Sequence, residues 1–366
     1  MNWQIKPIDQ TYAEPIQQHI DQKTKPLGSL GQLEILAKQL ALITNTCAQQ
    51  NTIKAQDCRI LIFAADHGIA EQGVSIAPAE VTGQMVANFV NGGAAINCFC
   101  RANQIDLKVI DAGVKFPPNL QSEQLINQWI AAGTLNIVEQ AAMSETQVQK
   151  ALKKGAEIAN QQINEGADIL GFGEMGIANT SAASALLSAI LALPVEQTVG
   201  RGTGISDLTF KHKQALIEQA LTRVLNQYQL SELAQIKQSL SPIQILAELG
   251  GFEIAQMVGA MLQSAECGRA IVVDGFIVSV AALIASQIEP AINAYFVFAH
   301  QSDEKAHQIV LDYFSAQPLL QLGLRLGEGT GAALAMPLIK SAAEFYNQMA
   351  TFASASISPV EQNSVK

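Results

Sequence analysis

The sequence predicts an α/β fold in which helices cover both faces of a doubly wound parallel sheet of about six strands. Two observations support this prediction. Short apolar runs that end in polar or glycine-rich turns alternate with longer segments of helical periodicity. The 366 residues are 49% hydrophobic, 15% charged and only 5% aromatic, a composition that favours close packing of helices on a sheet in a large core.

The N-terminal segment is expected to lie outside this sheet. Residues 1–25 are polar and contain prolines, and residues 23–31 form a turn-rich hinge. A helix is expected at Leu33–Leu42, where apolar residues recur at helical spacing. These features predict a small helical element beside the main domain.

Three strands are expected in the first half of the chain. Arg59–Ala65 is a continuous apolar run, which is typical of a strand buried on both faces. The other two strands are expected at Leu107–Asp111 and Asp168–Phe172. Helices are expected between them at Glu80–Arg101 and Ser144–Gly166.

The second half continues the alternation of strands and helices. Strands are expected at Ala270–Asp274, at Ala294–Ala299 and, more weakly, at Gln197–Val199. The helices between and after them are expected at Ala182–Leu193, Leu208–Asn226, Ile254–Ala265, Phe276–Gln287 and Glu304–Phe314. A further apolar helical run covers Ala332–Ile339, and the serine-rich tail from residue 353 is expected to be disordered.

Charge and cysteine content limit the partners and the compartment. A formal charge of −10 argues against nucleic acid or an anionic membrane, so an anionic substrate needs local donors. The first residues, MNWQIK, lack the apolar region of a signal peptide, and runs such as Ile277–Ala285 are too short to span a bilayer. The five cysteines contain no CxxC pair, so we expect reduced, mostly buried thiols in a cytoplasmic protein.

The segment Gly323–Gly331 carries one carboxylate, Glu328, between two glycines and ahead of a helical run. Flanking glycines let a ligand approach, and the alternating Leu324 and Leu326 suggest that the segment leaves a packed region. A buried glutamate has a raised pKa, which suits a general base near neutral pH. The alternative is that Glu328 only complements the dipole of the following helix.

Two glycine-rich loops are candidates for binding a phosphate. Gly171–Ser181 follows a strand and opens a helix, where backbone N–H groups and the side chains of Asn179 and Thr180 are available. Gly200–Asp207 is the second loop, with Lys213 in the helix after it. The spacing G-x-G-x-x-G occurs without its acidic ribose partner, and no Walker lysine is present. The alternatives are an ordinary tight turn and a solvated lysine.

Metal and hydrolase chemistry find little support in the sequence. Asp66-His67-Gly68 ends the first strand, but no further ligands stand at the spacing of a metal site. A structural or substrate-shaping role is favoured for this motif. His300 and His307 flank Ser302 without forming a triad, and no G-x-S-x-G elbow exists. No metal and no organic cofactor are therefore expected.

Seven segments together resemble the nicotinate-nucleotide–dimethylbenzimidazole phosphoribosyltransferase (CobT) family, which makes the lower-ligand nucleotide of cobalamin. The resemblance is nearly full-length, begins at the hinge Thr24–Leu30 and reaches the final helix. The seven segments are Ala65–Gly68, Asn91–Asn97, Gly173–Thr180, Gly200–Gly204, Val273–Ile277, Ala299–Ser302 and Arg325–Gly331. Each is modest alone, but seven in the expected order are specific.

The resemblance implies a large Rossmann-like domain at residues 51–330 and a small helical domain from both chain ends. The small domain would comprise residues 1–50 and the C-terminal helix at 331–352, followed by a disordered tail at 353–366. A homodimer is implied, with small-molecule substrates. The implied reaction moves 5-phosphoribose from β-nicotinate mononucleotide to 5,6-dimethylbenzimidazole with inversion, giving α-ribazole 5′-phosphate and nicotinate.

The resemblance also implies roles for single residues. Glu328 matches the general base, and Glu174 and Lys213 match positions that handle the substrate. The phosphate and ribose are expected at Gly176, Asn179, Thr180, Gly202, Thr203, Gly204 and Ser302. The benzimidazole is expected near Ala77, Met85 and Leu326. The best-known family pattern has a serine and a glutamine at the first two of these base-binding positions, so relaxed base specificity is expected here. The alternative is that a neighbouring side chain such as Gln84 restores the lost contacts and leaves the specificity unchanged.

Two other function classes stay open at this point. One is a nucleotide-dependent oxidoreductase on a similar fold, which the missing ribose-binding fingerprint disfavours. The other is a nucleotide-binding sensor without catalysis. Release of nicotinate from its mononucleotide separates both from a phosphoribosyltransferase.

Overall fold

The computed structural model describes residues 2–48, 50–202 and 204–358, and its centre is a six-stranded parallel sheet. The strand order is β3-β2-β1-β4-β5-β6. The chain adds strands outward to one side from β1 and then to the other side from β4, so the order of the strands reverses between β1 and β4, although all strands are parallel. This order confirms the predicted doubly wound α/β fold, in which ligands bind beyond the carboxyl ends of the strands at the reversal. The strands are β1 (Cys58–Ala65), β2 (Asp106–Gly113), β3 (Leu125–Asn127), β4 (Ile169–Met175), β5 (Ala270–Val273) and β6 (Phe296–Phe298).

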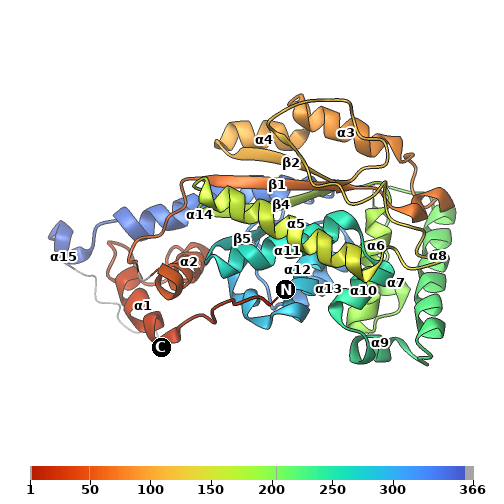
Figure 1. Ribbon diagram of the computed structural model, residues 1–366. Coiled ribbons are helices and arrows are strands. Elements are labelled where there is room, and N and C mark those ends of the chain that lie inside the picture. The colour runs from red at the N-terminus through yellow and green to blue at the C-terminus, as the bar shows by residue number, and fades with distance from the viewer. Residues whose placement is uncertain (1, 49, 203, 359–366) are drawn as a thin grey trace.

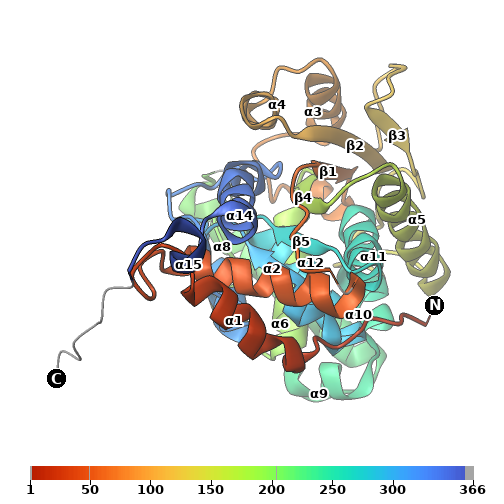
Figure 2. The ribbon, with the colours of Figure 1, turned by 90° about the vertical axis from the view of Figure 1, so that its left-hand side faces the viewer.

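Helices cover both faces of the sheet. Figure 2 shows α5 and α11 on one side of β1 and β4, with α14 on the other. The α-helices are α1 (Ala13–Asp21), α2 (Gln32–Ala48), α3 (Glu80–Val90), α4 (Ala95–Asn103), α5 (Glu145–Asn164), α6 (Asn179–Leu191), α7 (Val195–Thr198), α8 (Asp207–Gln227), α9 (Leu233–Ser239), α10 (Pro242–Leu249), α11 (Phe252–Glu266), α12 (Phe276–Ile288), α13 (Lys305–Tyr313), α14 (Thr330–Gln348) and α15 (Phe352–Ala355).

The central strands β1 and β4 form the middle of the core. Every residue of β1 is buried, as its continuous apolar run predicts, and Ile62 pairs with Val109 on one side and with Gly173 on the other. A Cβ at Gly173 would lie 2.6 Å from the carbonyl carbon of Glu328. Glycine at this position therefore lets the turn before α14 pack directly on β4.

The two ends of the chain meet beside the sheet. Lys23 and Thr351 form an isolated antiparallel bridge, and α2 packs against α14. Figure 1 shows α1, α2 and α14 together at one side of the molecule. The expected disorder does not hold at the start of the tail, because α15 begins at Phe352 with Thr351 as its cap. Residues 359–366 lie outside the described residues.

One strand prediction was wrong, and one strand was missed. Gln197–Val199 is not a strand, because Val195–Thr198 forms the short helix α7 after Pro194. Val195 and Thr198 are three residues apart and both buried, which is helical spacing, and the hydroxyl of Ser184 donates to the carbonyl of Thr198. The sixth strand is instead β3, a three-residue edge strand whose residues are half-buried or exposed.

The helix predicted at Glu80–Arg101 is two helices. The helix α3 ends at Val90, and α4 begins at Ala95. Gly92 between them has a φ of 77°, a left-handed conformation that glycine adopts without steric cost. The break turns α4 away from α3, so that α4 packs against β2 and α14.

The cysteines agree only in part with the prediction. All five are free thiols, as expected. Only Cys58 and Cys100 are buried, whereas Cys98 is exposed and the other two are half-buried. Among the described residues, we find no helix that is both long and apolar enough to cross a membrane.

Candidate active site

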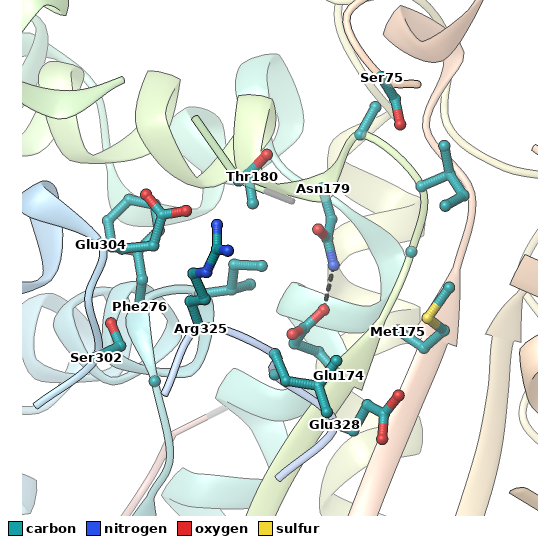
Figure 3. A pocket seen from close by; sticks show the side chains of 18 of the residues that line it. Ser75, Glu174, Met175, Asn179, Thr180, Phe276, Ser302, Glu304, Arg325 and Glu328 are labelled. Carbon is teal, nitrogen blue, oxygen red and sulfur yellow. Dashed lines mark hydrogen bonds between the residues drawn. The ribbon is translucent and has the colours of Figure 1, made fainter. Parts of the chain in front are cut away.

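A pocket of about 430 Å³ lies beyond the carboxyl ends of β4 and β5. The end of β4, the start of α6, the segment before α3 and the turn before α14 all contribute to its wall (Figure 3). Parallel strands bring their carboxyl ends to one edge, which explains why segments far apart in sequence meet there. The pocket thus lies at the carboxyl edge of the sheet, where α/β sheets bind their ligands, and it is next to the reversal between β1 and β4.

Most of the predicted site residues line this pocket. They are Ala77, Met85, Glu174, Gly176, Asn179, Thr180, Gly202, Lys213, Ser302, Leu326 and Glu328. Gly204 is not among the lining residues, and Thr203 lies outside the described residues. Lining residues that were not predicted include Ser75, Asp274, Phe276, His300, Glu304 and Arg325.

Glu328 lies in a strained turn with its carboxylate buried. Gly327, Glu328 and Gly329 have φ values of 85°, 64° and 84°, a left-handed conformation that costs a non-glycine residue about 1–2 kcal/mol. Its side-chain Oε2 has no hydrogen-bond partner within the described part of the chain. Burial raises the pKa of Glu328, and the charge of Asp274 raises it further, whereas the backbone N–H of Ile96 lowers it.

The packed lead-in that was expected before Glu328 is absent. Leu326 is 54% exposed, and Leu324 is only half-buried. The apolar alternation was misread, because these side chains belong to a surface turn at the rim of the pocket. Leu326 nevertheless contributes to the pocket wall, as predicted.

Glu174 is the second buried carboxylate of the pocket. Its Oε2 accepts a hydrogen bond from the side-chain amide of Asn179 (Figure 3). Burial raises the pKa of Glu174 to about 8, and the charges of Glu253, Asp274 and Glu328 add to the shift, whereas the bond from Asn179 opposes it. Glu174 is therefore mostly a neutral acid at neutral pH, which makes it a hydrogen-bond donor.

Lys213 and Thr180 join the two glycine-rich loops at one end of the pocket. The Lys213 ammonium donates to Oγ1 of Thr180 over 2.7 Å, and the residue is only 2% exposed. The solvated-lysine alternative is therefore wrong. Burial lowers the pKa of Lys213 to about 8, which the nearby carboxylate of Glu304 partly offsets.

The helix α6 begins at the same end of the pocket. It starts at Asn179, three residues earlier than predicted, after Ala178 in a left-handed conformation. Ala178 offers no side chain to cap the helix, and the backbone N–H groups of Asn179 and Ser181 already donate to the carbonyls of Gly176 and Ala178. The backbone N–H of Thr180 makes no such bond within the described ranges and is the donor that the start of α6 offers. The second loop follows the helix α7 instead of a strand, but it still brings Gly202 to this end of the pocket.

The opposite end of the pocket is mostly apolar. Ala77 and Met85 lie there with Val74, Ile76, Val81 and Ile177. Gln84 is exposed and does not line the pocket. The hydroxyl of Ser75 accepts a hydrogen bond from the backbone N–H of Ala77 over 3.2 Å and is one polar group on this wall.

Two histidines lie at the pocket wall: His300 lines the pocket, and His307 lies behind Ser302. His300 Nε2 is 3.7 Å from Oδ1 of Asp274, which also accepts the backbone N–H of Ala332 over 2.8 Å. The Nδ1 of His307 accepts the hydroxyl of Ser302 over 2.9 Å, and burial lowers the pKa of His307 to about 3. His307 is thus neutral and holds Ser302 in place.

Asp66 and His67 of the motif Asp66-His67-Gly68 are buried and bind side chains of neighbouring segments. Asp66 Oδ1 accepts the hydroxyl of Thr82 over 2.6 Å, and that same hydroxyl accepts the backbone N–H of Ile177 over 3.1 Å. His67 Nε2 is 2.7 Å from Oε1 of Glu253, with both side chains fully buried. The described ranges contain no group of three acidic, histidine or cysteine side chains arranged for a metal ion.

Two of the pocket residues that were not predicted, Asp274 and His300, had a recognisable signal in the sequence. Asp274 directly follows β5, and His300 follows β6 by two positions, where strand ends carry ligand groups. Glu304 and Arg325 had no such signal, because both lie on connections whose path depends on the tertiary fold.

Comparison with known proteins agrees with this geometry. A family model described as "Phosphoribosyltransferase" matches residues 5–357. The chain is 51% identical over 352 residues to a protein of Vibrio vulnificus (strain CMCP6) named nicotinate-nucleotide–dimethylbenzimidazole phosphoribosyltransferase, covering 96% of this chain and 99% of the relative. A protein of the same name from Shewanella baltica (strain OS223) is 50% identical over 366 residues, with 98% of each chain covered.

Solved structures agree as well. The crystal structure of CobT from Thermus thermophilus superposes with a TM-score of 0.87 and 38% identity. The match covers 95% of this chain and 99% of that chain. The similarity thus extends over almost the whole fold.

Proposed function

The chain belongs to the family of nicotinate-nucleotide–dimethylbenzimidazole phosphoribosyltransferases, and on this premise we propose that it transfers 5-phosphoribose from β-nicotinate mononucleotide to 5,6-dimethylbenzimidazole. The products are nicotinate and α-ribazole 5′-phosphate, the nucleotide of the lower ligand of cobalamin. The pocket offers an end with local donors for a phosphate and an apolar end for an aromatic base.

The phosphate binds at the end where the two glycine-rich loops meet. Lys213 supplies the charge, and Thr180, the start of α6 and the backbone around Gly202 supply hydrogen bonds. These local donors hold an anion despite the net charge of −10. Asn179 and Ser302 are further candidates for contacts with the phosphoribosyl group.

The chemistry needs one proton acceptor. Nicotinate leaves as the bond from C1′ to its ring nitrogen breaks, and that ring loses its positive charge without a proton. The incoming azole forms the new N–C1′ bond through one nitrogen and loses a proton from the other. Glu328 accepts this proton, so a single carboxylate suffices, in contrast to the carboxylate pair of most glycosidases.

Inversion follows if the base and nicotinate lie on opposite faces of C1′. The apolar wall with Met85 and Ala77 holds the incoming ring, and the loops hold the phosphate, so that the two reactants are oriented together. Glu174, as a neutral acid, donates a hydrogen bond to the ribose.

The burial and the backbone conformation of Glu328 are the observations that carry this proposal. Its Oε2 is buried without a partner in the described ranges, and the backbone that places it is in a left-handed conformation. An unsatisfied buried oxygen and strain both cost stability, and such costs concentrate at functional sites. A residue that only complements a helix dipole needs neither.

The test is a direct assay with nicotinate mononucleotide and dimethylbenzimidazole. We expect free nicotinate to appear in equal amounts with a product whose anomeric configuration is α by NMR. Omission of the azole should remove most of the nicotinate signal. Absence of nicotinate release with both substrates, in folded protein, would contradict the proposed function.

The assembly and the compartment are part of the same proposal. We propose a homodimer, as the resemblance to the family implies. We also propose a small domain of residues 1–50 and 331–352, because α2 packs against α14. The five free thiols support a reducing, cytoplasmic location. Light scattering at a defined protein concentration tests the dimer.

A further inference from the structure

Glu304 lies in the pocket without a role in the reaction. It is the N-cap residue of α13, and its carboxylate rests against Gly200, where a Cβ would overlap Oε2. The backbone N–H of Gly202, the ammonium of Lys213 and the guanidinium of Arg325 stabilise its charged form, and Asp303 opposes it. Figure 3 shows Glu304 at the same end of the pocket as Thr180 and Arg325.

Two of these groups, Lys213 and the backbone N–H of Gly202, are also donors that the proposed function assigns to the phosphate. A bound phosphate therefore brings a second anion to donors that already stabilise a carboxylate. Two anions that share the same donors in a partly buried site repel each other strongly. Either the carboxylate moves away or it takes up a proton.

The carboxylate already lies against the second glycine-rich loop. Its Oε2 occupies space that a Cβ on Gly200 would take, and Glu304 lines the same pocket as Gly202 and Lys213, so a bound phosphate meets the carboxylate there. Burial already raises the pKa of Glu304 against the opposing effect of Lys213. A phosphate dianion nearby shifts the equilibrium further toward the acid.

We propose that Glu304 takes up one proton from solvent when the phosphate of the nucleotide binds. The carboxylate occupies the donors of the empty site, and the neutral acid then donates its O–H to a phosphate oxygen. This inference rests on the proposed function, because it assumes a phosphate at this end of the pocket. It makes Glu304 a specificity residue for the phosphate group.

Calorimetry in buffers of different ionisation enthalpy measures the protons taken up on binding. The ligands are nicotinate mononucleotide and inorganic sulfate at about pH 7, where sulfate carries no titrating proton and a phosphate monoester is mostly ionised, since its second pKa is about 6. Lys213, with a pKa of about 8, is ~90% protonated there and contributes about 0.1 proton. We expect the wild type to take up about 0.5 proton or more per ligand.

Two variants assign the proton. Glu304→Gln should take up almost no protons when a ligand binds. It should also bind the anion about ten-fold more tightly at pH values near 8, because the repulsion between carboxylate and anion is gone. Asp303→Asn, which removes the neighbouring exposed carboxylate, should keep the uptake of the wild type.

Absence of proton uptake by the wild type at about pH 7 overturns the inference without any variant. So does an unchanged uptake in Glu304→Gln, or weaker binding of both ligands by that variant, which would show that the carboxylate holds the site together. A wild type that binds neither ligand contradicts the proposed phosphate site instead.

Discussion

The Lys213 ammonium lies 2.7 Å from the hydroxyl oxygen of Thr180, and this bond joins α8 to the start of α6 across the pocket. A buried lysine whose charge is not neutralised in a close ion pair is costly, and burial lowers its pKa to about 8. A bound phosphate would restore the full charge. The lysine is thus held ready for an anion.

Replacement of Lys213 by methionine should weaken binding of nicotinate mononucleotide much more than it slows turnover. Methionine keeps the unbranched shape and most of the length of the side chain but removes the charge that meets the phosphate. We expect the KM for the nucleotide to rise by about 10²-fold, on the scale of a lost charged hydrogen bond. Lys211→Met, on the exposed side of the same helix, is the control and should leave KM unchanged.

Glu174→Gln should stabilise the fold above neutral pH. The pKa of Glu174 is about 8 in the folded protein, against an ordinary value of 4.5. The protonated Glu174 therefore contributes fully to the free energy of unfolding below pH 4.5, and this contribution is lost as the pH rises through about 8. The variant should therefore match the wild type near pH 4.5 and gain several degrees in Tm above pH 8.

Thermal melts across this pH range measure the difference between variant and wild type. Glu123→Gln, at an exposed glutamate, is the matched control and should show no such trend. A constant difference in Tm at every pH would mean that Glu174 is not protonated in the folded state.

Thr82 should prove to be a positioning residue for the pocket wall. Its hydroxyl donates to Asp66 and accepts from Ile177, so it links α3, which carries Met85, to the loop after β4. Thr82→Val keeps the shape but leaves both partners unsatisfied, at a cost of about 1–3 kcal/mol. We expect a higher KM for the azole and lower stability, whereas Thr82→Ser, which keeps the hydroxyl, should restore the KM.

Steady-state kinetics of both variants separate the two effects. If Thr82→Val loses stability but keeps the wild-type KM for the azole, the hydroxyl supports the fold without positioning the wall.

The fold was largely predictable because its main strands are buried on both faces. Such a strand appears in the sequence as an apolar run, as at Arg59–Ala65, and the polar residues at its end mark the sheet edge. The strand β3 left no such run, because it lies at the edge and is partly exposed. Gln197–Val199 was misassigned because three residues carry too little periodicity to separate strand from helix.

The site was predictable where its residues lie beside glycine-rich turns. Glu328 and Asn179 belong to such turns, and both line the pocket. Glu304 and Arg325 were missed, because their places in the pocket depend on the paths of connections after β6. The exposure of Leu326 was missed for a related reason. Alternating apolar residues, such as Leu324 and Leu326, occur both in segments packed in a core and in turns at the rim of a pocket.

The enzyme should accept several azoles. The wall near Ala77 and Met85 is apolar, Gln84 points elsewhere, and a hydrophobic pocket gains only about 1–3 kcal/mol of discrimination per methylene. Competition between dimethylbenzimidazole, benzimidazole and adenine in one reaction should give more than one product.

Restoring polar groups at these two positions, in the double variant Ala77→Ser and Met85→Gln, should narrow the range of products. Exclusive use of dimethylbenzimidazole by the wild type would refute relaxed specificity, and the phosphoribosyltransferase assignment would stand.

The most direct measurement of the central claim is the single-turnover rate of Glu328→Gln with nicotinate mononucleotide and dimethylbenzimidazole. Glutamine keeps the shape of the side chain but cannot accept the azole proton as a carboxylate does. We expect the rate to fall by about 10²–10⁴-fold, with affinity for the nucleotide unchanged. A rate near that of the wild type would contradict the assignment of Glu328 as the general base.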